Sequence, residues 1–205
     1  MNIITDQYTA PDTINLVFKR TVFKYRSLFN VTDVQGNIVF KVRNKLFSWL
    51  RDTIVILNAN GDALATLREK SGKWNAYKGE SISKRDCIFT AKHHSWLSMR
   101  PRMDVFVASN KSKKNCDFTL KQTLLGTNCT IYSGNAEESN AQLAQIRGKQ
   151  TIKSCFSGQN KLLCEIFPNV DQAFVVALYV VVDEEQRRSS KDAADVVSNT
   201  ISNAI

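Results

Sequence analysis

The sequence predicts a mainly β domain, either a closed barrel or a sandwich, with one apolar segment near its C-terminal end. Short stretches rich in β-branched and aromatic residues recur about every 8–12 residues and are separated by turn residues, which is the pattern of an all-β fold. Two successive stretches repeat the same hairpin pattern. Residues 173–182 depart from this rhythm, because they contain no charged residue and no turn residue.

The first strands are expected within residues 14–25, and the repeated hairpin unit follows them. Residues 29–42 and 54–67 each contain Asp or Asn, then two residues, then Gly followed by Asn or Asp, then alternating apolar positions. Glycine supplies the positive φ of a tight turn, and an Asp or Asn side chain closes the turn by bonding the nearby backbone. We therefore predict hairpin turns at 33–37 and 58–62.

The same rhythm continues along the rest of the chain. Further strands are expected near 72–77, 87–91, 103–108, 118–125, 129–132, 141–146, from about 151, and 161–167. Consecutive short strands joined by tight turns indicate an antiparallel meander.

The apolar run within residues 171–185 is too short for a membrane-spanning helix, which needs roughly 20 apolar residues. Its five valines favour a buried strand. A helix is the alternative, because Pro168 and Asn169 interrupt the chain before it and Asp171 can cap its first turn. The residues alone leave strand and helix equally open.

Composition and charge set broad limits. The 205 residues, 43% of them hydrophobic, fit one large domain or two small ones with a sizeable core. The net charge is +9, and it rises to +11 for residues 1–182 because the remainder is acidic. This excess favours an anionic partner, such as a membrane surface, phosphoinositide headgroups or nucleic acid, although solubility alone explains it equally well.

The cysteines and the N-terminus indicate an intracellular protein. The five cysteines include no CxxC pair, and the first residues lack the basic region and apolar core of a secretory signal. Reduced thiols in the cytoplasm or nucleus are therefore expected. We expect Cys87, Cys129 and Cys164 to act as small buried apolar residues.

Four blocks of sequence resemble one known family. In order and spacing, VTDVQGNIVFKV (31–42), ILNANGDALATLREK (56–70), KWNAYKGES (73–81) and VDQAFVVALYVVVDE (170–184) are similar to the plant LURP-one-related proteins. The resemblance extends over about residues 10–186. This family in turn resembles the tubby C-terminal domain and the phospholipid scramblases.

The resemblance implies a twelve-stranded antiparallel closed β-barrel around one central apolar helix at about 171–182. A single domain would then occupy residues 1–186, followed by a flexible tail over 187–205. The expected core residues of the helix are Phe174, Val175, Val176, Leu178, Tyr179 and Val180. The family is linked to basal plant defence, and it provides no active-site residues to carry over.

No catalytic, metal or cofactor site is predicted. His93 and His94 are the only histidines, zinc sites need four ligands at defined spacings, and a strand would point adjacent residues to opposite faces. Neither a glycine-rich phosphate loop nor a twelve-residue calcium loop is present. We therefore expect a protein that is not an enzyme.

Two basic clusters are the candidate contacts for anionic headgroups. They are Lys41, Arg43 and Lys45, which a strand would place on one face, and Lys111, Lys113 and Lys114 in a turn. Each such positive charge near an anionic leaflet contributes about 1 kcal/mol to the free energy of membrane binding. The simpler explanation is a solvated outer surface whose charges deter edge pairing.

The expected function is a non-enzymatic module that binds phosphoinositides or another anionic membrane lipid, because similar tubby domains bind phosphatidylinositol bisphosphate. The first alternative is a transcriptional or signalling adaptor that binds a protein or DNA, although no nucleic-acid-binding motif is present. The second is lipid scrambling or transfer. We expect a cytoplasmic monomer without a transmembrane segment, located peripherally at the plasma membrane or in the nucleus.

The segment after the apolar run carries a separate prediction. Arg187 and Arg188 precede Ser189 and Ser190, a pattern typical of sites for kinases that select basic residues. Apolar residues recur every four positions further on, but Asn and Ser are poor helix formers. We therefore expect a frayed tail.

Overall fold

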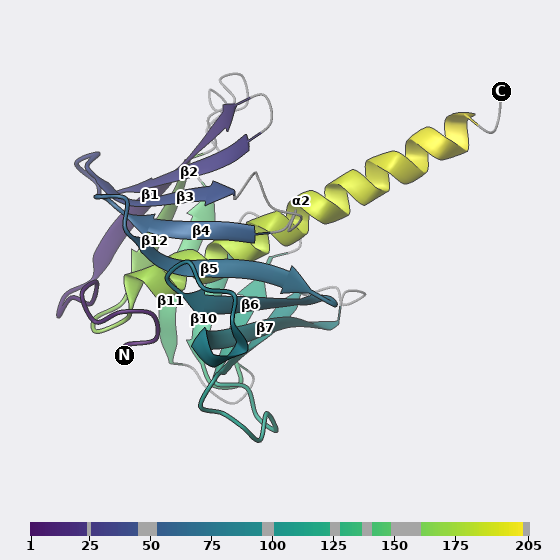
Figure 1. Cartoon of the computed structure of the whole chain (residues 1–205). Coiled ribbons are helices and arrows are strands. Elements are labelled where there is room, and N and C mark those ends of the chain that lie inside the picture. Colours follow the sequence, from purple (N-terminus) through teal and green to yellow (C-terminus); the bar gives the residue numbers. More distant parts are fainter. Residues whose placement is uncertain are drawn as a thin grey trace.

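A computed structural model describes residues 1–23, 26–44, 53–95, 101–123, 128–136, 141–148 and 161–202. Within this part of the chain, twelve antiparallel strands form a closed barrel around one long helix (Figure 1). The strands are β1 (Ile14–Phe23), β2 (Arg26–Thr32), β3 (Ile38–Asn44), β4 (Thr53–Asn58), β5 (Ala63–Lys70), β6 (Lys73–Lys78), β7 (Cys87–Ser95), β8 (Arg102–Val107), β9 (Phe118–Gln122), β10 (Cys129–Ser133), β11 (Gln142–Gly148) and β12 (Lys161–Ile166). A 3-10 turn, η1 (Lys84–Asp86), precedes β7, and the helix is α2 (Gln172–Ser202). The predicted fold class is confirmed.

Each strand pairs with its neighbours in sequence, and β1 closes the barrel by pairing with β12. The register places Leu16 opposite Cys164 and Phe18 opposite Leu162. Closure leaves no sheet edge free among the described strands, so these strands present no unpaired backbone ladder to another chain.

The two predicted hairpin turns are present and share one geometry. The Asp33 N–H donates to the Asn37 carbonyl at 2.9 Å, and the Asn37 N–H donates to Asp33 Oδ1 at 2.8 Å. Asn58 and Asp62 repeat the pattern, with 2.9 Å for both corresponding bonds. The glycine of each turn has a φ of +99° or +102°, which favours glycine over residues that carry a Cβ. The Asn58 side chain therefore closes the second turn in the same way that the Asp33 side chain closes the first.

The apolar run forms the first part of α2 and fills the barrel. All six predicted core residues are buried, and the Tyr179 side chain is the most exposed of them at 8%. Phe174 packs edge-on against Phe89 with ring centroids 5.3 Å apart, and Tyr179 packs against Phe18 at 4.5 Å. A helix suits this interior because it satisfies its own backbone hydrogen bonds, whereas a strand inside a closed barrel would have no partner.

Asp171 joins the start of α2 to the N-terminal segment, residues 1–13. Its Oδ1 accepts the Phe174 N–H at 3.0 Å, so it caps the helix as the sequence predicts. Its Oδ2 accepts the N–H groups of Ile3, Ile4 and Thr5 at 3.0, 2.6 and 3.0 Å. The Asp171 side chain has no exposed surface. A single buried carboxylate therefore fixes the N-terminal segment across one end of the barrel.

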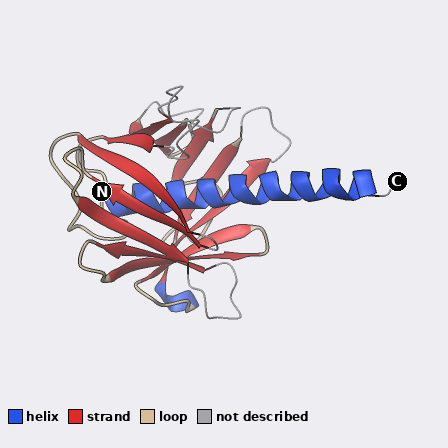
Figure 2. Ribbon diagram, turned by 90° about the horizontal axis from the view of Figure 1, so that it is seen from above, coloured by secondary structure: helices blue, strands red, loops and turns tan. Residues whose placement is uncertain are grey.

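The helix is longer than expected. It does not end near residue 182 but continues to Ser202 and projects out of the barrel (Figure 2). Residues 183–202 contain no glycine or proline, and extending a nucleated helix costs much less than starting one. The proposed division into a barrel over 1–186 and a flexible tail over 187–205 stays a prediction.

Limited trypsin digestion is expected to cleave α2 after Lys191 before it cleaves the barrel, and so to remove the residues beyond Lys191, because a projecting helix frays more readily than a barrel. Mass spectrometry of the products should show a stable body that has lost these C-terminal residues. A projecting helix as resistant as the barrel would contradict this expectation.

The two ends of the barrel are formed by different segments. The turns 33–37, 58–62, 79–86 and 108–117 lie at the end where the N-terminal segment and the start of α2 also lie, and we call it the closed end. The helix leaves through the opposite end, which we call the exit end (Figures 1 and 2).

Candidate functional site

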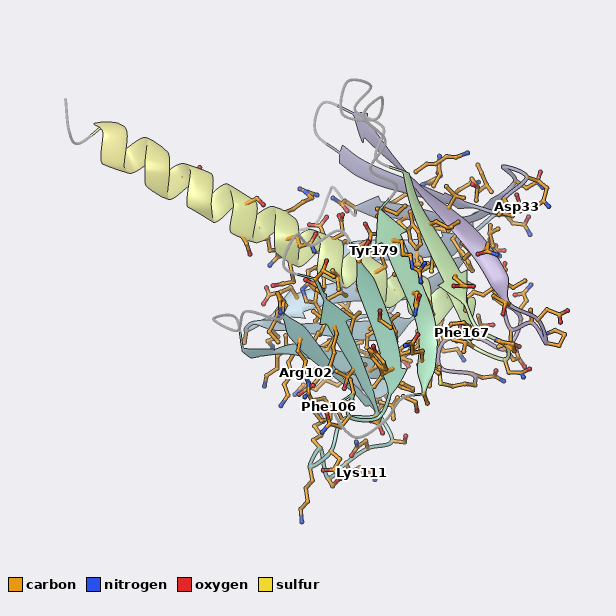
Figure 3. The ribbon with its side chains drawn as sticks, turned by 180° about the vertical axis from the view of Figure 1, so that it is seen from behind. Asp33, Arg102, Phe106, Lys111, Phe167 and Tyr179 are labelled. Atoms are coloured by element: carbon orange, nitrogen blue, oxygen red, sulfur yellow. The ribbon has the colours of Figure 1, made fainter. Side chains whose placement is uncertain are left out.

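The lysines of the predicted basic turn project from the closed end. Lys111, Lys113 and Lys114 are exposed, and within the described residues none of them forms an ion pair. Asn110 organises the loop: its Oδ1 accepts the Lys113 N–H at 3.0 Å, and its Nδ2 donates to Asp117 Oδ2 at 2.9 Å. Figure 3 shows Lys111 extending away from the body of the barrel. The sequence-predicted cluster is therefore presented on a loop of defined shape.

The second predicted cluster lies elsewhere. Lys41 and Arg43 are on the outer face of β3, where the Lys41 Nζ donates to the Ala59 carbonyl at 2.7 Å and Arg43 is exposed. Lys45 lies outside the described residues. In the barrel order, β4 to β7 separate β3 from β8, so the two clusters lie at different positions around the barrel, although the Lys41 ammonium reaches the turn at Ala59.

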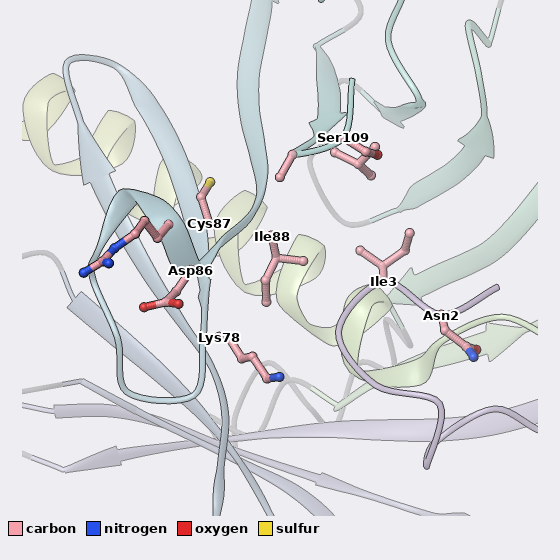
Figure 4. A pocket seen from close by; sticks show the side chains of 10 residues that line it. Asn2, Ile3, Lys78, Asp86, Cys87, Ile88 and Ser109 are labelled. Atoms are coloured by element: carbon pink, nitrogen blue, oxygen red, sulfur yellow. The ribbon is translucent and has the colours of Figure 1, made fainter. Parts of the chain in front are cut away.

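A cavity of about 390 Å³ opens at the closed end beside the lysine loop (Figure 4). It is open to solvent, and three separate segments line it: the N-terminal segment, the region from the end of β6 to the start of β7, and the end of β8. Its lining residues are Asn2, Ile3, Lys78, Arg85, Asp86, Cys87, Ile88, Val107, Ala108 and Ser109. Sequence reasoning missed this site because no single segment contains it.

The charges around the cavity are mostly positive. Lys78 and Arg85 line it, and Asp86 is the one carboxylate among its lining residues, with its Oδ2 accepting the Ser81 hydroxyl at 2.5 Å. Burial raises the pKa of the Cys87 thiol, while a hydrogen bond with Thr90 and the positive charge of Lys113 partly oppose that rise. The thiol is therefore largely protonated at neutral pH, and a protonated thiol is a poor nucleophile.

A polar cluster joins α2 to the neighbouring strands β5, β6 and β7 at the exit end. The Trp74 indole Nε1 donates to Glu185 Oε1 at 2.6 Å, and His93 Nε2 lies 3.3 Å from Glu185 Oε2. Arg188 stacks 5.1 Å from the centre of the Trp74 ring and lies 3.6 Å from Glu69 Oε2. These contacts fix the position of the helix where it leaves the barrel. The sequence indicated only that Glu185 follows the apolar run.

This cluster predicts a specific pH dependence. Burial would raise the pKa of Glu185, but hydrogen bonds with His93 and Trp74 and the charge of Arg188 outweigh burial and lower it. A carboxylate with a lowered pKa stabilises the fold above its ordinary pKa of 4.5, and this contribution is lost as pH falls through the lowered value.

We therefore expect the free energy of unfolding to fall more steeply below about pH 4.5 in the natural protein than in Glu185→Gln. Urea denaturation over a pH series measures this difference. Asp12→Asn, at an exposed carboxylate, is the control. Identical pH profiles for the natural protein and Glu185→Gln would contradict the role given to Glu185.

The cysteines only partly match their predicted role. Cys129 and Cys164 are buried, and burial raises the pKa of both thiols. Cys87 is only half-buried because it lines the cavity, so its expected burial is corrected. The four cysteines in the described part of the chain, these three and Cys116, are free thiols.

Other predicted features are placed as follows. Ser189 and Ser190 lie on α2, where their hydroxyls donate to the carbonyls of Glu185 and Gln186 at 3.0 and 2.9 Å. In the described ranges, no three His, Cys, Asp or Glu side chains gather closely enough to hold a metal ion. Nor does any helix there combine the length and hydrophobicity needed to cross a bilayer.

Comparison with known proteins agrees with the fold. Residues 14–183 match the LURP-one-related family. The chain is 36% identical to LURP-one-related 15 of Arabidopsis thaliana, over 90% of this chain and 86% of that protein. It is also 36% identical to LURP-one-related 10 of the same plant, over 94% of this chain and 100% of that protein. An X-ray structure of an Arabidopsis thaliana protein superimposes with a TM-score of 0.70 at 33% identity, over 90% of this chain and 98% of that one. The chain therefore belongs to the LURP-one-related family.

Proposed function

We propose that this protein is a non-enzymatic module that binds anionic membranes carrying phosphoinositides, and that the closed end of its barrel is the binding surface. The exposed loop with Lys111, Lys113 and Lys114 is the observation that carries the proposal. The likeness of its family to the tubby domain, whose members bind phosphatidylinositol bisphosphate, supports the same ligand class.

The electrostatics of this loop suit an anionic surface. The three lysines are exposed and have no ion pair within the described residues, so their charges are not already neutralised there. Each lysine near an anionic leaflet contributes about 1 kcal/mol, and three together raise membrane affinity about a hundredfold. Such binding would be reversible, peripheral and sensitive to salt.

A binding role without catalysis is consistent with the thiol at the closed end. Cys87 lines the cavity there, but burial raises its pKa, so it is a weak nucleophile at neutral pH. We further propose that the protein acts at the cytoplasmic face of the plasma membrane, in the defence signalling to which the resemblance links its family.

Vesicle co-sedimentation with three matched double variants tests the proposal. Lys111→Glu with Lys113→Glu changes the closed end, Lys41→Glu with Arg43→Glu changes β3, and Lys70→Glu with Lys73→Glu changes exposed residues of the exit end. All three lower the net charge equally. Only the closed-end variant is expected to lose binding to phosphoinositide vesicles, by at least about tenfold.

Two results would reject the proposal. One is equal recovery of the natural protein with neutral and phosphoinositide-bearing vesicles at physiological salt. The other is equal loss in all three variants, which would mean that net charge alone drives binding. Salt-dependent retention on random duplex DNA, without vesicle binding, would favour the adaptor alternative instead.

A further inference from the structure

We propose that the closed-end cavity binds a phosphate monoester carried on a small uncharged ring, such as a phosphorylated cyclitol or sugar. This inference rests on the proposed function, because it assigns the headgroup site of the same surface. The cavity of about 390 Å³ falls within the range of roughly 300–1,000 Å³ that is typical of small-molecule sites.

The cations of the cavity suit a phosphate. Arg85 on η1 and Lys78 at the end of β6 line it, and within the described residues neither forms an ion pair. A guanidinium binds phosphate oxygens in pairs, and an ammonium adds a point charge. Lys113 adds positive potential, since its charge already acts on the thiol of Cys87.

The single lining carboxylate does not reverse this preference. Asp86 Oδ2 accepts the Ser81 hydroxyl at 2.5 Å, so one of its oxygens is already engaged. Against it stand the two lining cations and the nearby Lys113. The local charge is therefore positive and favours a ligand with at least two negative charges.

The other wall of the cavity is apolar. Ile3, Ile88 and Val107 line it together with Ala108, so a ligand that presents a carbon-rich ring face gains contacts that inorganic phosphate cannot make. In Figure 4 the side chains of Ile3 and Ile88 lie on facing segments around the opening. This wall selects a phosphorylated ring over a free phosphate ion.

The wall contributed by the N-terminal segment is held in place before any ligand binds. The Ile3 N–H donates to Asp171 Oδ2 at 3.0 Å, and Ile4 and Thr5 bond the same oxygen. Because this wall is already fixed, binding does not need to order it, and a preformed site loses less affinity to conformational entropy.

Cys87 provides a built-in reporter of occupancy. The full-length protein is alkylated at mildly alkaline pH, and modification of each cysteine is followed by peptide mass spectrometry. Inositol trisphosphate is expected to slow alkylation of Cys87 at least fivefold and to leave Cys116, which lies outside the cavity lining, unchanged. Inositol without phosphate and inorganic phosphate at the same concentration are expected to have little effect. Failure of inositol trisphosphate to protect Cys87 would overturn the inference.

Variants that replace one cationic side chain by an uncharged glutamine locate the binding site. Arg85→Gln and Lys78→Gln are expected to weaken inositol trisphosphate binding, measured by calorimetry, about tenfold or more each. Lys84→Gln is the matched control, because Lys84 also belongs to η1 but does not line the cavity. Equal weakening by all three variants would place binding outside the cavity and reject the assignment.

A comparison of Cys87 protection by phosphoinositide vesicles and by inositol trisphosphate identifies the source of the phosphate. Protection of Cys87 by phosphoinositide vesicles identifies a lipid headgroup, whereas protection by inositol trisphosphate alone identifies a soluble ligand and rejects the proposed membrane function. Charge-dependent vesicle binding without protection of Cys87 by either probe rejects the cavity site and leaves the membrane proposal standing. The two proposals therefore fail in distinguishable ways.

Discussion

Val176→Asp is expected to abolish the folded state. The Val176 side chain has no exposed surface, and it lies on the part of α2 that strands enclose from every side. An aspartate there would be a buried charge without a partner, which costs several kcal/mol against a total stability of about 5–15 kcal/mol. Val180→Asp, one helical turn further on and 1% exposed at the natural valine, is expected to have the same effect.

Soluble yield and the thermal midpoint, followed by circular dichroism, measure this effect. Ser190→Asp is the control, because Ser190 is exposed on the same helix beyond the barrel. The control is expected to fold with nearly the natural midpoint. Tolerance of either valine substitution would mean that one face of the helix meets solvent, which a barrel closed around the helix does not allow.

Asp171→Ala is expected to destabilise the protein by about 3–5 kcal/mol, a large effect for one substitution. The carboxylate accepts N–H groups from Ile3, Ile4 and Thr5 through one oxygen and caps α2 at Phe174 through the other. Its loss leaves these donors without their acceptor and removes the helix cap. The N-terminal segment would then lose its attachment to the helix.

Urea denaturation measures the free energy of unfolding for this variant. Asp12→Ala removes an exposed carboxylate from the same segment and is expected to change stability by less than about 0.5 kcal/mol. Asp171→Asn, which retains one acceptor oxygen, should fall between the two. A cost for Asp171→Ala no larger than that for Asp12→Ala would show that the carboxylate does not hold the closed end together.

The local parts of the fold were predictable because they depend on neighbouring residues. The turns at 33–37 and 58–62 follow from an Asp or Asn, a glycine and strand alternation within a few positions. The state of the run 173–182 does not follow in this way, since five valines favour a strand while its surroundings require a helix. The family resemblance predicted the helix. The closed barrel explains it, because a helix satisfies its own backbone hydrogen bonds and needs no neighbouring strand.

The remaining features depend on contacts between distant segments. Asp171 was predicted to cap the helix, but its three bonds to residues 3–5 connect positions more than 160 apart in sequence. The closed-end cavity likewise combines the N-terminal segment with Lys78 and Ser109. The extension of α2 to Ser202 was not predicted, because Asn and Ser are poor helix formers. The absence of glycine and proline from this segment nevertheless lets the helix continue.

The most direct test of the barrel-around-helix account compares the thermal unfolding of two truncated chains. A chain that ends at Gln186 keeps the buried part of α2 and is expected to unfold cooperatively with a midpoint close to the natural one. A chain that ends at Asn169 lacks the helix, leaves the inward faces of the strands without their core and is expected to be insoluble. A soluble, cooperatively unfolding chain that ends at Asn169 would contradict the account.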